Sequence, residues 1–348
     1  MPQLEAESFH TCVTSPPYFG LRDYGLKPTY WPEVTYTPMP GLPPMTVSEW
    51  TGCLGLEPTP EMFVAHMVLV FREVWRLLRK DGTLWLNYGD SYAAGGNGGG
   101  GAFMDERRAW KGRSSKNGWR KPPEGLKRKD LVGIPWRVAF ALQADGWYLR
   151  MDNVWNKTNP MPESVRDRPT KAHEYIFLLA KSERYYYDRD AVLELLAETS
   201  VARLAQNVEA QQGSKRAAGG AKVNGAMKAL FSVRGSRGVY NKPLNSARRN
   251  GEKPFVLPKM RNRRSVFTGP TASFTEAHFA VFPEWLIKPC ILAGAPVGGR
   301  VLDPFGGSGT TLKVALENNR ECTIIEMGPQ YVEIAERRTA VIQPTLNI

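Results

Sequence analysis

The chain has 348 residues, enough for one large α/β domain and a smaller insert. Its formal net charge is +12, and residues 199–270 hold 15 Lys and Arg against 2 Asp and Glu. The 31 basic and 32 acidic residues elsewhere nearly cancel, so the excess positive charge belongs to that one segment. A nearly neutral body with one basic segment favours an enzyme that binds a polyanion, although a solvated linker would have a similar charge. No apolar run is long enough to span a bilayer, and the first residues resemble no secretory signal.

The cysteine pattern is typical of a reducing compartment. Four cysteines lie far apart in the sequence, at Cys12, Cys53, Cys290 and Cys322. They match neither a metal-ligand spacing nor a disulfide framework. We therefore expect a cytoplasmic protein without a bound metal.

The first predicted strand ends in two prolines. Thr11–Thr14 is short and largely β-branched, which is typical of a buried strand. Pro16 and Pro17 cannot donate to a ladder and fix φ, so they end the strand in a rigid turn. Open α/β sheets bind their ligands at such carboxyl ends. We expect the Ser15 hydroxyl, the Pro16 carbonyl and the Tyr18 ring to face a ligand there.

The next stretch predicts a loop, a helix and a strand in turn. Residues 19–60 are rich in Pro, Gly and aromatic residues without periodicity, which predicts a long loop over the ligand site. Residues 60–80 are amphipathic and predict a helix, and residues 83–88 predict a strand. That strand ends in Asn87-Tyr88-Gly89-Asp90, a second polar cluster at a carboxyl end.

A glycine run interrupts the pattern. Residues 95–101 are six glycines and one asparagine, a composition that is costly to order. The basic residues that follow, 107–129, include Trp110 and Trp119. This predicts a mobile basic loop over residues 91–130 that orders on a polyanion, and a surface loop without a role explains the composition equally well.

The rest of the chain alternates helical and strand patterns. Helices are predicted over residues 131–144, 190–210, 283–293, 310–318 and 329–339. Strands are predicted over residues 148–155, 175–180, 299–302 and 322–325, the first two as a pair. The last segment therefore reads as strand, glycine loop, helix, strand and acid, the arrangement of a dinucleotide-type cofactor site.

The glycine loop excludes two common phosphate-binding motifs. Gly307 and Gly309 let the backbone approach a ligand that a side chain would block. A P-loop needs a lysine after its last glycine, and the nicotinamide fingerprint needs a third glycine where Leu312 stands. Glu326 ends the next predicted strand, where a carboxylate can accept both hydroxyls of a ribose.

Two stretches together resemble a known family. Ser15-Pro16-Pro17-Tyr18 is similar to the catalytic tetrapeptide of the DNA amino-methyltransferases. Residues 301–311 resemble that family's S-adenosylmethionine loop, Asp-Pro-Phe-x-Gly-x-Gly-Thr, and residues 159–165 and 173–177 are also similar to family segments. The catalytic motif precedes the cofactor motif, which is the order of the family's β group. The resemblance covers most of the chain except the basic middle and the first few residues.

The resemblance implies a fold and a domain plan. The fold is the α/β, Rossmann-like methyltransferase fold: a mostly parallel twisted sheet with an antiparallel edge strand, a circularly permuted motif order and a basic target-recognition insert. Residues 1–190 would form the catalytic half, 191–272 the target-recognition region and 273–348 the cofactor-binding half. Family members usually have another strand ahead of the catalytic one. That strand is missing here, is supplied by the tail at 341–348, or belongs to a start upstream of residue 1.

The resemblance also implies a reaction: direct methyl transfer to the exocyclic amino group of a base flipped out of double-stranded DNA. Ser15 Oγ and the Pro16 carbonyl would accept the amino hydrogens and free the nitrogen lone pair, so no strong base is needed. Pro17 completes the rigid turn, and Tyr18 would stack on the base. Serine at the first position is more associated with cytosine N4, but its hydroxyl accepts a hydrogen bond from either amino group. Adenine N6 and cytosine N4 therefore both remain open as the target.

The implied cofactor, partners and location follow from the same resemblance. S-adenosylmethionine would be held by Asp303, Phe305, Gly307, Gly309, Thr310 and Glu326. The implied partners are double-stranded DNA and a second copy of the chain in a homodimer. The implied setting is the cytoplasm of a bacterium, with a bacterial or phage-borne gene, either paired with a restriction enzyme or acting alone.

Alternative interpretations involve other residues and other acceptors. Cys290 follows a proline, as a cytosine-C5 nucleophile does, but its place in an amphipathic helix predicts a core residue. His173 and Glu174 have no companion ligand at helical spacing, so we expect a structural role for them. An RNA or protein-amide methyltransferase on the same fold, and a DNA-binding protein with an inactive cofactor site, are the alternative functions.

Overall fold

The computed structural model describes residues 1–21, 23–93, 122–123, 125–197, 199, 260–272 and 282–342. The chain divides into two compact units, one formed by Met1–Val192 with Arg264–Ile348 and the other by Leu193–Arg263. Most of the residues predicted as the basic loop and the target-recognition region lie outside the described part. None of the described helices is long and apolar enough to cross a membrane.

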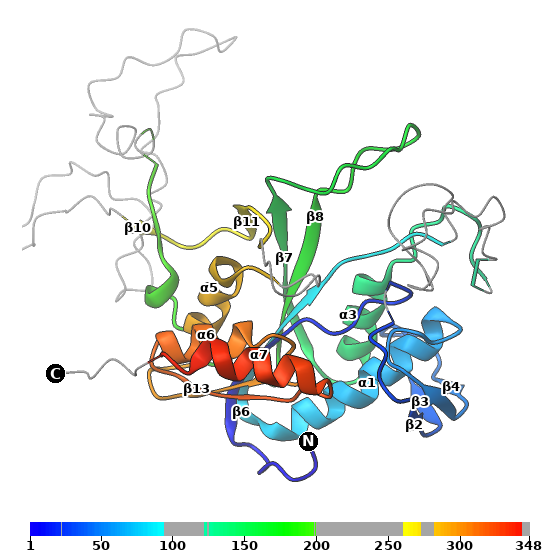
Figure 1. Cartoon of the computed structure of the whole chain (residues 1–348), viewed down its shortest axis with the longest axis horizontal. Helices are drawn as coiled ribbons and strands as arrows, with labels where there is room; N and C mark the ends of the chain where they lie inside the picture. Colours follow the sequence, from blue (N-terminus) through cyan, green and yellow to red (C-terminus); the bar gives the residue numbers. More distant parts are fainter. Residues whose placement is uncertain are drawn as a thin grey trace, which may run out of the picture. The chain divides into compact units, whose positions relative to one another are not determined.

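A seven-stranded sheet forms the centre of the larger unit (Figure 1). Its order is β11-β7-β8-β6-β1-β12-β13. The strands are β1 (Phe9–Thr14), β6 (Leu78–Tyr88), β7 (Tyr148–Lys157), β8 (His173–Ala180), β11 (Val266–Gly269), β12 (Arg300–Asp303) and β13 (Glu321–Ile324). Successive side chains of a strand point to opposite faces of the sheet, so in a sheet covered on both sides buried side chains project from both faces.

The antiparallel strand lies inside the sheet, which corrects the expected edge position. β8 is antiparallel to both β6 and β7, whereas the other neighbouring pairs are parallel. β11 adds a parallel strand to β7 through Val266↔Val154 to Gly269↔Lys157. β11 was missed because it is four residues long and lies in a basic stretch without periodicity.

Helices cover both faces of the sheet. In Figure 1, α1 and α3 lie on one side of the sheet, and α5, α6 and α7 lie on the other. Their bounds are α1 (Pro60–Leu77), α3 (Ile134–Ala144), α5 (Glu284–Gly294), α6 (Thr310–Glu317) and α7 (Pro329–Thr339). On β6, Leu84 and Leu86 belong to the core on the α1 side, whereas Trp85 belongs to the core on the α5 side.

The signals at the ends of α1 explain its bounds. Thr59 caps the helix by accepting a hydrogen bond from the Met62 amide at 3.2 Å, and Pro60 occupies the first turn. The helix ends at Leu77, three residues earlier than predicted, because Leu78 already pairs with Phe9 of β1. Local periodicity therefore predicts where the helix lies, whereas pairing with a strand that is distant in sequence determines where it ends.

Residues 19–60 contain two small hairpins, so the expectation of a plain loop is wrong. β2 (Thr29–Trp31) pairs with β5 (Trp50–Gly52), and β3 (Val34–Tyr36) pairs with β4 (Met45–Val47). The fully buried His66 of α1 binds Glu57 at 2.8 Å and stacks against Trp31, with ring centroids 4.5 Å apart. Three-residue strands are too short for a periodicity signal, and it is this packing on α1 that fixes them.

The predicted helix over residues 190–210 is wrong at its start, over residues 190–197. A short 3₁₀ turn (Asp190–Val192) is followed by β9 (Glu194–Leu195), which pairs with β10 (Met260–Arg261) in the smaller unit. The Asp188 carboxylate accepts from the Asp190 and Ala191 amides at 3.1 and 3.0 Å, which stabilises the turn. Residue 198 and residues 200–210 lie outside the described part.

At the other edge of the sheet, β13 pairs only with β12 among the residues that the structure describes. The described part of the chain ends in a turn at Ile342. Residues 343–348, which belong to the tail expected as one source of a further strand, lie outside the described part. The five strands β1, β6, β7, β12 and β13 all run the same way, so the segments that follow them meet at one edge of the sheet.

Candidate active site

The two predicted motifs lie on neighbouring strands. β1 pairs with β12 in parallel through Thr11↔Val301 and Cys12↔Leu302. The proline turn after β1 and the glycine loop after β12 therefore begin side by side. This confirms the expectation that segments almost 290 residues apart in sequence meet at one carboxyl edge of the sheet.

Asp303 holds this junction together. It is 1% exposed, and it accepts hydrogen bonds from Thr14 Oγ1 and Thr311 Oγ1, both at 2.6 Å. The Phe305 amide donates to the same carboxylate at 3.0 Å. Burial raises the pKa of Asp303 to about 6, while these three hydrogen bonds act in the opposite direction. The carboxylate thus ties the catalytic strand, the glycine loop and α6 to one point.

The glycine loop is shaped by α7. Gly309 has φ +77°, and a Cβ atom there would lie 2.6 Å from Cβ of Ala335 on α7. Arg338 of α7 donates to the Ser308 carbonyl at 2.7 Å and to Thr310 Oγ1 at 3.1 Å. Gly309 is therefore required for close packing of the loop on the helix, and the buried Thr310 hydroxyl takes part in bracing it.

Glu326 lies two residues beyond β13 and faces the loop. Its carboxylate accepts from the Gly307 amide at 2.8 Å and from the Gly328 amide at 2.7 Å. One hydrogen bond on each oxygen leaves further acceptor capacity on both, which suits a ribose diol. Gly307 has φ +48°, and the nearest atom to a Cβ there would be the Phe305 carbonyl oxygen at 3.9 Å, so this side of the loop is open. The chemistry and the open space at the loop fit an adenosine cofactor.

Tyr18 is held by side chains from two other strands. Its hydroxyl donates to Glu174 Oε2 at 2.8 Å and lies 3.3 Å from Asn87 Oδ1, and its ring centroid is 5.8 Å from that of Tyr88. Burial, aided by the Glu174 charge, raises the pKa of Tyr18 well above its ordinary value. Pro16 is buried, whereas Ser15 and Pro17 are half-buried at the site edge.

Three residues of this cluster were not predicted as site residues. Glu174 of β8 contacts Lys157 of β7, and Asn87 of β6 donates to Glu174 Oε2 at 3.3 Å. Asn87 was recognised only as part of a polar strand end, and Glu174 was given a structural role. The register Trp155↔Glu174, which places Lys157 diagonally across from Glu174, connects positions far apart in sequence and cannot be read from spacing.

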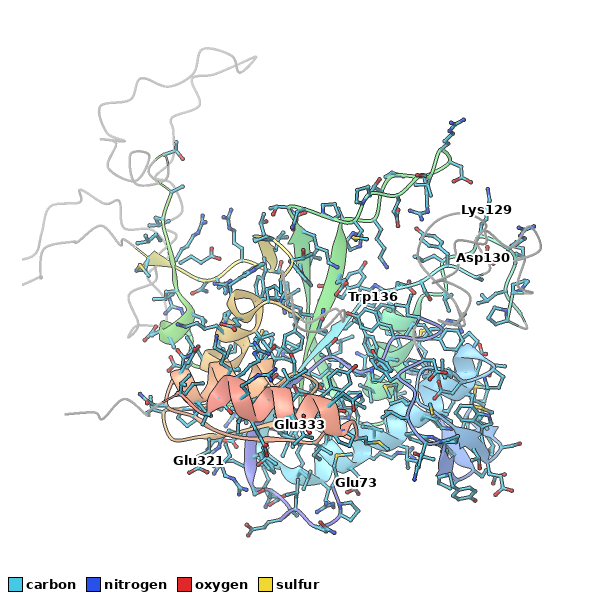
Figure 2. The ribbon with its side chains drawn as sticks, viewed as in Figure 1. Glu73, Lys129, Asp130, Trp136, Glu321 and Glu333 are labelled. Carbon is cyan, nitrogen blue, oxygen red and sulfur yellow. The ribbon has the colours of Figure 1, made fainter. Side chains whose placement is uncertain are left out.

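Other candidate residues have structural positions. Cys290 is fully buried in α5, in agreement with its prediction as a core residue. His173 packs edge-on against Tyr175, and Trp136 of α3, labelled in Figure 2, packs edge-on against the same ring. Within the described ranges, no group of three or more His, Cys, Asp or Glu side chains could hold a metal ion.

The raised pKa of Asp303 predicts a pH dependence of stability. A carboxyl whose pKa is about 6 in the folded chain and 3.8 in the unfolded chain stabilises the fold most below pH 4, and this contribution is lost as the pH rises through 6. Relative to Asp303→Asn, the wild-type free energy of unfolding should fall by roughly 2 kcal/mol between pH 4 and 7. Urea denaturation of both proteins across that range measures the difference, and a difference that stays constant or grows with pH contradicts it.

Comparisons with known proteins agree with this geometry. A family model described as DNA methylase, of the N6/N4 type, matches residues 9–337. The chain is 39% identical over 343 residues to the type II methyltransferase M.SmaI of Serratia marcescens, with 96% of this chain and 85% of that protein covered. It is also 39% identical over 342 residues to the type II methyltransferase M.Cfr9I of Citrobacter freundii, with 97% and 83% covered.

A solved structure has the same fold. The PvuII DNA methyltransferase (cytosine-N4-specific) superposes with a TM-score of 0.53 at 16% sequence identity, covering 99% of this chain and 83% of that one. The family match spans nearly the whole chain and includes both the proline turn and the glycine loop. The chain therefore belongs to the N6/N4 DNA methylase family and is an S-adenosylmethionine-dependent DNA amino-methyltransferase of the type found in restriction–modification systems.

Proposed function

We propose that the proline turn is where the amino group of a flipped base is held during methyl transfer. Ser15 Oγ and the Pro16 carbonyl accept its two hydrogens, which pushes the nitrogen toward sp³ geometry and frees its lone pair. Pro17 keeps the turn rigid, and the Tyr18 ring stacks on the base. The observation that carries the proposal is the β1–β12 pairing, because it puts this turn beside the loop that binds the methyl donor.

The methyl donor is assigned to the loop after β12. Glu326 accepts the ribose hydroxyls, and the open backbone at Gly307 with the half-buried Phe305 ring lines the site. Gly309, Thr310 and Asp303 set the shape of the loop, and Asp303 has three hydrogen bonds within the protein. When bound, S-adenosylmethionine supplies an electrophilic methyl group on a sulfonium centre, which favours aromatic neighbours.

The target base is an adenine or a cytosine. Both present an amino group with two hydrogens, and the pair of acceptors at Ser15 and Pro16 suits either of them. Serine at the first position of the tetrapeptide is associated in the family with cytosine N4, which makes cytosine our first candidate. The basic residues 199–270, most of which lie outside the described part, are assigned to target recognition in duplex DNA.

A homodimer is proposed on the family resemblance. Tyr30, Met39 and Leu42 are exposed large apolar side chains of the hairpin region, with 60%, 41% and 48% exposure, and such a patch suits a protein interface. Light scattering of the full chain at micromolar concentration should give twice the chain mass. A monomer both free and with DNA bound contradicts the dimer. The proposed setting is the cytoplasm of a bacterium, where the DNA substrate is.

Methyl transfer itself is tested with labelled S-adenosylmethionine. Purified protein and unmethylated genomic DNA should yield label in N4-methylcytosine or N6-methyladenine after digestion to nucleosides. Ser15→Ala should lower the rate at least about a hundredfold, because one of the two acceptors that free the lone pair is lost. RNA and a protein glutamine substrate serve as alternative acceptors. Label in one of those and in no DNA base contradicts the proposal.

The ribose role of Glu326 is tested by Glu326→Ala. The loss of two acceptors for the diol should weaken S-adenosylmethionine binding by at least about a hundredfold in calorimetry, because each hydrogen bond to a charged group contributes about 1.5–3 kcal/mol and two are lost. Glu321→Ala is the matched control, since Glu321, labelled in Figure 2, is exposed and begins the same strand. Equal affinity of the two variants contradicts the assignment.

A further inference from the structure

Four side chains form a connected polar cluster beside the proline turn. Tyr18 follows β1; its hydroxyl contacts Asn87 at the carboxyl end of β6 and Glu174 at the start of β8, and Glu174 in turn contacts Lys157 at the carboxyl end of β7. All four lie at the sheet edge where the two motifs meet. The proposed function gives the Tyr18 ring a stacking role but assigns nothing to the carboxylate behind its hydroxyl.

Glu174 is a nearly buried carboxylate with all of its contacts inside this cluster. Its side chain is 14% exposed and that of Lys157 is 18% exposed. Lys157 contacts Oε1, while Oε2 accepts from the Tyr18 hydroxyl at 2.8 Å and from Asn87 Nδ2 at 3.3 Å. Lys157 also lies 4.5 Å from the centre of the Trp155 ring. Enclosing a carboxylate to this extent costs desolvation free energy, which the ion pair with Lys157 offsets.

The backbone at Gly89 leaves space for the Tyr18 ring that a side chain would fill. A Cβ atom at Gly89 would lie 2.6 Å from Tyr18 Cε2 and 3.2 Å from Glu174 Oε1. The ring is therefore bounded by Gly89 along one edge and by Tyr88 at 5.8 Å between centroids. Its hydroxyl then has Glu174 as the nearer of two acceptors, since Asn87 Oδ1 lies at 3.3 Å. A hydrogen bond to a carboxylate is also about twice as strong as one to an amide.

The direction of these hydrogen bonds has a consequence for Ser15. A phenol has one hydroxyl proton, and here it is donated in a hydrogen bond to Glu174, so the Tyr18 oxygen can only accept from further partners. The Ser15 side chain lies beside Tyr18 and opposes the rise in the pKa of Tyr18 that burial and Glu174 cause. A serine hydroxyl that donates to the Tyr18 oxygen keeps its lone pairs for another donor. The amino group of a substrate needs such an acceptor.

We propose that Glu174 is a positioning residue for methyl transfer: by accepting the hydrogen bond of the Tyr18 hydroxyl it fixes the stacking ring and leaves the Ser15 hydroxyl to act as an acceptor. Lys157 holds Oε1 of the Glu174 carboxylate, and Asn87 donates to Oε2 beside the Tyr18 hydroxyl. This inference rests on the proposed roles of Ser15 and Tyr18. It extends the catalytic assembly from one loop to three strands of the sheet. Ser15 Oγ and the Pro16 carbonyl remain the groups proposed to contact the reacting amino group.

A double-mutant cycle tests the coupling. Tyr18→Phe keeps the ring and removes the hydroxyl, and Glu174→Gln keeps the shape and removes the charge. The rate of a single turnover is measured with excess enzyme, tritiated S-adenosylmethionine and unmethylated genomic DNA. Each single variant should be slower by about tenfold, and the double variant should lie within about twofold of the slower single one, because both changes remove the same interaction. Cofactor affinity should stay within about twofold in all of them.

The controls separate this proposal from a purely structural ion pair. Asp152→Asn removes an exposed carboxylate from the neighbouring strand β7 and should keep the wild-type rate. Thermal melting shows which variants are folded, and the rate is compared only among those. The proposal is overturned if the double variant loses the product of the two single effects, about a hundredfold, or if Glu174→Gln keeps the wild-type rate. Ser15→Ala tests the underlying function separately: if it keeps the full rate, the role of Ser15 fails whatever the cycle shows.

Discussion

The pairing of β1 with β12 is the constraint on which the site depends. These strands are joined by backbone hydrogen bonds and by a carboxylate, Asp303, that accepts from Thr14 on one strand and from Thr311 on the following helix. If the register between them slipped by one residue, the side chains of β1 would change faces and Thr14 would lose this partner. In the described part of the chain, this carboxylate and the Thr311 hydroxyl, which also donates to the Val13 carbonyl at 3.4 Å, tie the two segments together, so the separation of the proline turn and the glycine loop is set by this junction.

The surrounding elements support that junction from outside. Arg338 of α7 braces the glycine loop from one side, and the close approach of Ala335 to Gly309 leaves no room for a side chain in the bend. On the other side, Gly89 leaves room for the Tyr18 ring, and Glu174 receives its hydroxyl. Rigid support of this kind is what positioned acceptors need, because a displacement of about 1 Å in an active site can cost a hundredfold in rate. The cofactor side and the base side are thus held by different helices and strands.

Sequence reasoning succeeded where the signal was local. The Pro16-Pro17 turn, the glycine loop and the periodic helix at 60–77 each carry their information within a few residues. The first two also matched a family, which gave the order of the motifs and the expectation that the turn and the loop lie side by side. Reasoning failed for the hairpins in residues 19–60 and for β11, where strands of three or four residues depend on packing or on a distant partner. It also placed the antiparallel strand at the edge, whereas β8 pairs with β7 on one side and with β6 on the other, and such partners cannot be read from spacing along the chain.

The candidate site shows the same division between local and distant information. Ser15, Tyr18, Gly307, Gly309 and Glu326 were identified from motifs and strand ends. Glu174 was assigned a structural role, because its contacts to Tyr18 and Lys157 arise from the register of β7 and β8 and not from spacing along the chain. A buried carboxylate with a lysine across a strand pair is recognisable only once that register is known.

Methylation-aware sequencing of DNA from cells that express the protein tests the central claim most directly, namely that the turn and the loop form one site for transfer to a base amino group. Wild-type protein should leave N4-methylcytosine or N6-methyladenine at one recurring sequence. Proteins with Ser15→Ala in the turn or Glu326→Ala in the loop should each leave far less at that sequence. The account is contradicted if the wild-type pattern persists with either variant, or if the modified positions carry 5-methylcytosine.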